Sequence, residues 1–150
     1  MANYTGANVI TASDVTKYQP DAFGFGTEAI TTNADTHTTT IADGSADPGR
    51  SIFLKYTGTL DSACTITIGP NTVSKLWFIE NATSGSQNII IKQGSGATVT
   101  IPNGQTKAIY SDGAGSGAAM VDAFTDLNLA GTTTTSSFLS IVVVKDTGSY

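Results

Sequence analysis

Residues 63–80, ACTITIGPNTVSKLWFIE, hold two segments with the composition and periodicity of β-strands. In the first, Cys64 and two isoleucines alternate with alanine and threonine, which is typical of a strand with one buried face. A Gly-Pro-Asn turn at 69–71 separates it from Ser74–Glu80. That second segment is almost continuously apolar, which predicts a central strand buried on both faces, with Trp77 in the core.

Similar segments continue on both sides of this stretch. After Arg50, β-prone runs and turn residues recur at about the 8–12-residue spacing of a sandwich or barrel. Asn103-Gly104 supplies the positive φ values of a short hairpin turn. We expect an all-β fold, an antiparallel, jelly-roll-like β-sandwich of roughly seven to eight short strands. The expected strands are 51–56, 63–68, 74–80, 88–92, 97–101, 106–110 and 138–144, with a brief strand or helical turn within 118–129.

The first fifty residues differ from the rest. They are polar, with isolated apolar residues, and only 27–30 and 37–41 suggest short strands. We therefore predict an extended N-terminal arm with edge strands over residues 1–50 and a β-sandwich domain over residues 51–150. Exposed aromatic side chains often anchor interfaces, so the candidate partner-binding residues are the aromatics of the arm: Tyr4, Tyr18, Phe23 and Phe25.

Charge and composition exclude several classes of function. Only 13% of the residues are charged, the net charge is −5, and the seven basic residues are scattered, so nucleic-acid binding is not expected. We expect no membrane span and no signal peptide. One cysteine cannot form an internal disulfide, which suits synthesis in a reducing cytoplasm. So little charge indicates a surface that is covered in a permanent assembly.

Two motifs suggest ligands but have simpler interpretations. Gly113, Gly115 and Ala118 follow a predicted strand in a Gly-x-Gly-x-x-Ala pattern, as in a dinucleotide site. Such a site also needs a helix after the glycines and an acidic residue ending the next strand, so we expect a flexible turn. Asp43, Ser45 and Asp47 alternate as in a calcium loop, but the loop glycine and final glutamate are missing, which favours an Asx turn.

The remaining candidates for catalysis are few. His37 is the single histidine, without the nucleophile elbow or oxyanion hole of a hydrolase. Cys64 is expected to be a small core residue. The two glutamates, Glu28 and Glu80, are the obvious carboxylates for glycoside hydrolysis, but Glu80 ends a strand at the expected surface rim. We therefore expect no enzymatic activity, no cofactor and no bound metal.

The segment from Lys75 to Ala123 resembles a module of tailed-bacteriophage structural proteins, notably from phages of aquatic bacteria. The resemblance is carried by ENATSG at 80–85, IKQGSGATVTIPNG at 91–104 and YSDGAGSG at 110–117, within about a third of the chain. It implies a β-sandwich element of capsid-surface or tail-fibre-like proteins, with no catalytic residues to transfer.

The resemblance and the composition together predict a virion protein. We expect a capsid decoration (cement) protein that binds the major capsid protein and neighbouring copies of itself, as a homotrimer or another symmetric oligomer. It would be made in the host cytoplasm and located on the capsid surface. The alternatives are a tail-fibre, spike or tail-adaptor component that contributes to host attachment and, from a different class, a carbohydrate-binding module.

Overall fold

The structure is a computed structural model, which describes residues 23–41 and 46–125. Strands dominate these residues, and helical structure is limited to two short 3-10 turns, so the expected all-β fold is confirmed. The elements are β1 (Phe25–Ala29), β2 (Thr36–Thr40), η1 (Pro48–Arg50), β3 (Phe53–Thr57), β4 (Cys64–Gly69), β5 (Lys75–Asn81), β6 (Ile89–Lys92), β7 (Val99–Ile101), β8 (Thr106–Ser111), η2 (Gly115–Gly117) and β9 (Met120–Asp122).

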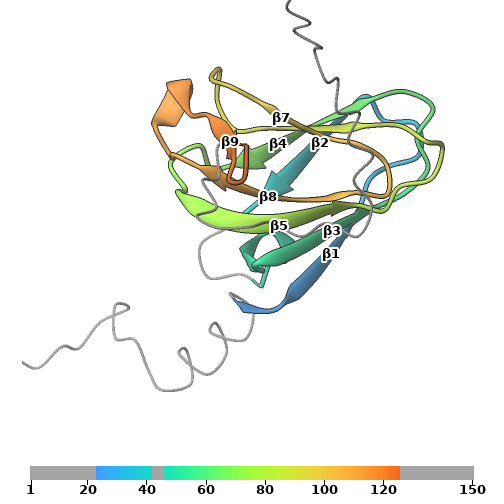
Figure 1. The fold of residues 1–150 in the computed structure, drawn as a ribbon, viewed down its shortest axis with the longest axis horizontal. Helices are drawn as coiled ribbons and strands as arrows, with labels where there is room; N and C mark the ends of the chain where they lie inside the picture. Colours follow the sequence, from blue (N-terminus) through green and yellow to red (C-terminus); the bar gives the residue numbers. More distant parts are fainter. Residues whose placement is uncertain (1–22, 42–45, 126–150) are drawn as a thin grey trace, which may run out of the picture.

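The strands form two facing sheets, and the chain alternates between them from β1 to β6. Sheet A has the order β1-β3-β5-β8-β9, which can be followed in Figure 1. Sheet B has the order β2-β4-β6-β7. In each sheet the first three strands are parallel. Each of the pairs β1–β2, β3–β4 and β5–β6 therefore forms one coil of the chain, with one strand in each sheet, and the three coils stack on one another. The strand β7 then pairs antiparallel with β6, and β8 pairs antiparallel with β5. The chain therefore follows the coil formed by β7 and β8 in the direction opposite to that of the first three coils.

The hydrogen-bond ladder continues around one corner between the sheets. Leu60 N donates to Ser84 O over 3.0 Å, and Ala82 N donates to Tyr56 O over 2.9 Å. Thr59 and Ser84 also form an isolated parallel bridge. The connection from β3 to β4 therefore lies directly against the connection from β5 to β6. This regular stacking keeps side chains of successive coils in register on each outer face.

The predicted antiparallel jelly-roll is wrong, because both sheets are mixed and their first three strands are parallel. A turn every few residues arises equally from a hairpin and from a corner that takes the chain to the facing sheet. The turn at 102–104 illustrates the difference. Gly104 has the expected positive φ of 73°, but the turn joins β7 of sheet B to β8 of sheet A and is no hairpin.

The core lies between the two sheets. Trp77 is fully buried, as predicted, and its Nε1–H donates to the Gly49 carbonyl over 2.7 Å. Cys64 is also fully buried, which confirms its predicted place on a core face. The other fully buried large side chains are Leu54, Tyr56, Leu60, Ile66, Ile68, Ile79, Ile89, Ile91, Ile101, Ile109 and Met120.

The strands β1 and β2 lie at the edges of their sheets. Both belong to the same two sheets as the later strands. The division into an arm (1–50) and a sandwich domain (51–150) stays a prediction. The predicted strand at 138–144 lies outside the described residues.

Candidate interaction surface

Two of the four predicted contact residues can be placed. Phe23 is 75% exposed and Phe25, the first residue of β1, is 61% exposed. Tyr4 and Tyr18 lie outside the described residues. A single exposed phenylalanine is common on protein surfaces, whereas a larger apolar patch marks an interaction site. The neighbours of Phe25 therefore show whether it belongs to such a site.

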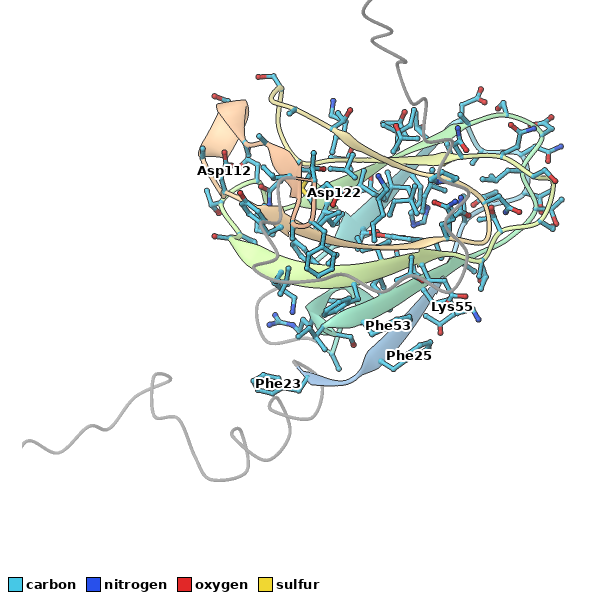
Figure 2. The ribbon with its side chains drawn as sticks, in the orientation of Figure 1. Phe23, Phe25, Phe53, Lys55, Asp112 and Asp122 are labelled. Carbon is cyan, nitrogen blue, oxygen red and sulfur yellow. The ribbon has the colours of Figure 1, made fainter. Side chains whose placement is uncertain are left out.

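Phe25 begins a row of aromatic side chains that crosses sheet A. It pairs with Phe53 of β3, which in turn pairs with Phe78 of β5. The rings of Phe25 and Phe53 stack with centroids 4.8 Å apart and planes inclined by 13°. Figure 2 shows these two side chains together on the outside of the ribbon. The parallel register places like residues directly beside each other.

The apolar surface extends beyond this row. Leu76 lies two residues before Phe78, on the same face of β5, and pairs with Tyr110 of β8. Tyr110 pairs with Val121 of β9. Leu76 and Tyr110 are each 42% exposed, and Phe78 is 36% exposed. We call this surface the aromatic face, and it consists of Phe25, Phe53, Leu76, Phe78, Tyr110 and Val121.

The aromatic face corrects one prediction. Ser74–Glu80 was expected to be buried on both faces, but in β5 only the side of Trp77 and Ile79 points into the core. The side of Leu76 and Phe78 faces outward, because none of the described residues forms a second layer over sheet A. A strand that is apolar on both faces normally has covering helices, and this chain shows no helical periodicity. That mismatch is the sequence signal for this surface.

A charged pair lies beside the phenylalanine row. Lys55 and Glu80 occupy neighbouring positions two residues further along β3 and β5, with Nζ and Oε1 3.6 Å apart. Thr27 and Thr106 continue this polar row on either side. Both charged side chains are partly exposed, so the pair contributes little to stability of the single chain.

The outer face of sheet B is chemically different. Thr36 pairs with Thr65, and Thr38 pairs with Thr67, so threonine side chains cover the outer side of β2 and β4. The charged member of this face among the described strands is Lys92. The two outer faces thus separate an apolar aromatic surface from a hydroxyl-rich one.

The titratable groups near the first coil serve the structure. His37 Nε2 and Glu28 Oε1 are 2.7 Å apart, and each side chain is 17% exposed. The Tyr56 hydroxyl lies 2.6 Å from Thr39 Oγ1. Burial, with a smaller contribution from the Glu28 charge, raises the pKa of Tyr56 far above its usual range. A hydroxyl held in its neutral form in this way is a poor general base.

Other candidates for chemistry also have structural roles. Burial raises the pKa of the Cys64 thiol, which disfavours the reactive thiolate. No helix follows Gly113 and Gly115, and the chain continues through η2 into β9, so the dinucleotide motif is the expected turn. Asp112 Oδ1 accepts bonds from the backbone N–H groups of Ala114 and Ala119, which fixes this turn.

The Asp-x-Ser-x-Asp pattern at 43–47, for which the sequence favours an Asx turn over a calcium loop, is only partly described, since Asp43 and Ser45 lie outside the described residues. Within 23–41 and 46–125, no three acidic, histidine or cysteine side chains gather as metal ligands. The same residues contain no helix long and apolar enough to cross a membrane.

Comparison with protein-family models, with curated proteins and with solved structures finds no match to this chain, so the aromatic face and its charged border carry the functional argument.

Proposed function

We propose that this chain is a non-enzymatic structural protein of a tailed-bacteriophage virion, a capsid decoration protein that binds the major capsid protein and stabilises the shell. The aromatic face is the observation that carries this proposal. Proteins that stay monomeric rarely leave a contiguous apolar patch uncovered, and such patches mark interaction sites. The resemblance of residues 75–123 to virion modules suggests the kind of particle in which the patch is covered.

The face can supply binding energy without charge. Full burial of one exposed phenylalanine or leucine contributes about 1.5–3 kcal/mol. Phe25, Leu76, Phe78 and Tyr110 each retain between 36% and 61% of their exposure, so only part of that energy is still available from each. A decoration protein needs only modest affinity per copy, because many contacts act together on one shell. Binding through apolar contacts also resists salt.

The predicted arm, residues 1–50, contains the first member of this surface. Phe25 is both the first residue of β1 and the first member of the aromatic row, and Phe23 is exposed just before it. In the proposal, the arm contacts the capsid protein or a neighbouring copy. Strand addition to an exposed sheet edge would supply main-chain hydrogen bonds there.

The arrangement of polar groups supports a role without catalysis. His37 and Glu28 bind each other, and Tyr56 binds Thr39 between the sheets. Each of these groups already has a partner within the fold. The oligomeric order expected for such a protein is a homotrimer or another closed symmetric assembly.

The test is binding to particles that lack the protein. Purified wild type should co-sediment with such particles, whereas Phe78→Ser should lose most of its binding and keep the same circular dichroism spectrum. Thr38→Ala on the outer face of sheet B is the matched control and should bind as wild type does. Equal binding of wild type and Phe78→Ser would refute the role of the aromatic face.

Copy number separates the proposal from its main alternative. A shell protein is present on the order of hundreds of copies per particle, because it repeats with the capsid lattice. A handful or a few dozen copies in purified virions would instead assign the chain to a tail fibre, spike or adaptor.

A further inference from the structure

We propose that the aromatic face packs against the same face of a second copy, around a two-fold axis that runs parallel to the strands midway between β3 and β5. This inference rests on the proposed function, in which copies of the chain also contact each other on the shell, and it assigns the aromatic face to that contact between copies, so that Phe78→Ser weakens particle binding by separating the dimer. It goes further in assigning a symmetry, a register and a set of residue pairs. Three features of the surface lead to it.

The first feature is the regular phenylalanine row. A two-fold axis between β3 and β5 exchanges the positions of these two strands across the interface. Phe53 of one copy then lies over Phe78 of the other, and the reverse contact repeats it. The same operation places Phe25 of one copy over the position of Ala108, because Ala108 pairs with Phe78 at the next place in the row. The facing residue at each end of the row is therefore a small alanine that its own copy already buries, so Phe25 packs over it without meeting a second large side chain.

The second feature is the charged border. Lys55 and Glu80 occupy β3 and β5 at the same level of the sheet. The axis that exchanges these strands brings Lys55 of each copy over Glu80 of the other. The pair of opposite charges in one copy is therefore complementary to the same pair in the second copy, whereas two like charges would face the same like charges of the second copy and repel them. An unrelated partner would need a matching pair of its own, but a second copy supplies it automatically.

The third feature is the low charge of the whole chain. Only 13% of the residues are charged, and the net charge is −5. Repulsion between copies is therefore small and is screened at physiological salt. The aromatic face itself contributes uncharged side chains alone, so its burial in a dimer leaves no charge of the face unpaired.

The experiment measures self-association of the full chain by analytical ultracentrifugation, without any particle present. Lys55→Glu makes the charged border wholly acidic, and Glu80→Lys makes it wholly basic. We expect a wild-type dimer and at least about tenfold weaker self-association for each variant alone. An equimolar mixture of the two variants should again form a dimer, since an acidic border then faces a basic one.

Two further variants keep the test independent of folding. Lys92→Glu changes the same charge on the outer face of sheet B and should leave the dimer intact. Phe78→Ser should abolish it, with an unchanged circular dichroism spectrum in every case.

A wild-type monomer at about 100 µM, a trimer, or a mixture that stays monomeric would overturn the inference. Failure of the proposed function is seen separately, because it shows as lost particle binding by a protein that still forms the two-fold dimer.

Discussion

The two faces of β5 predict opposite responses to mutation at adjacent positions. Trp77 is fully buried, and its indole N–H donates to the Gly49 carbonyl, while Leu76 is 42% exposed on the aromatic face. Replacement of a buried tryptophan by alanine costs about 3–5 kcal/mol. The orphaned carbonyl adds part of the 1–3 kcal/mol typical of an unsatisfied buried acceptor, so we expect Trp77→Ala to lower the free energy of unfolding by about 4–6 kcal/mol.

Leu76→Ala removes an apolar side chain from the same strand without opening a cavity. Its expected cost is below about 1 kcal/mol, as for most surface positions. Trp77→Phe provides an intermediate case, because it keeps an aromatic ring and loses the hydrogen bond to Gly49. We expect a cost between those of the other two variants.

The measurement is urea unfolding followed by far-UV circular dichroism, which does not depend on the tryptophan that is removed. Wild type provides a second check, since the fluorescence maximum of its single tryptophan should lie well to the blue of free indole in water. A cost below about 2 kcal/mol for Trp77→Ala, or above about 2 kcal/mol for Leu76→Ala, would show that the faces of β5 are assigned incorrectly.

Three further predictions follow from single positions. Gly85 has a φ of +96°, and a Cβ there would meet the Leu60 carbonyl oxygen. Gly85→Ala should therefore lower the free energy of unfolding in urea by at least about 2 kcal/mol. An unchanged free energy would contradict the stacked corner. The buried Cys64 thiol has a raised pKa and should react with a thiol reagent only after unfolding, and rapid reaction of the native protein would show that it is accessible. The hydrogen bond from Lys107, and a weaker one from the backbone, lower the pKa of Asp122. The unfolded chain therefore binds more protons than the folded one as pH falls below about 4, and the stabilisation from this partly exposed carboxylate, at most about 1 kcal/mol, is lost there. Asp122→Asn should remove that part of the acid dependence, and an unchanged acid transition would refute it.

The strands were predictable from local patterns, but their pairing was not. Alternation in 63–68 correctly identified the buried side of β4, and the edge positions of β1 and β2 agreed with the polar sequence around them. The alternation of apolar and polar residues in a strand indicates which side faces the core, but it does not indicate which strand lies beside it in the sheet. The parallel stacking depends instead on corners such as that at Gly58–Leu60, where the chain crosses to the facing sheet.

The candidate surface was only half predictable for a related reason. Phe23 and Phe25 were identified because they lie in a polar segment, where an aromatic residue is conspicuous. Phe53 and Phe78 lie within strongly apolar strands, where the sequence does not distinguish a core side chain from an exposed one. They join Phe25 only through the parallel register of three strands that are distant in sequence. Because this surface depends on which residues of the three strands lie side by side, it cannot be predicted until the pairing of the strands is known.

The central claim is that the protein reinforces a shell through contacts of its aromatic face, and heat-triggered DNA release tests it most directly. Release should be measured on particles with wild-type protein, without the protein, and with Phe78→Ser added in its place, alongside adsorption to host cells. We predict that particles without the protein, or with Phe78→Ser, release DNA at a lower temperature and adsorb normally. Unchanged thermal release together with lost adsorption would contradict the claim and assign the chain to host attachment.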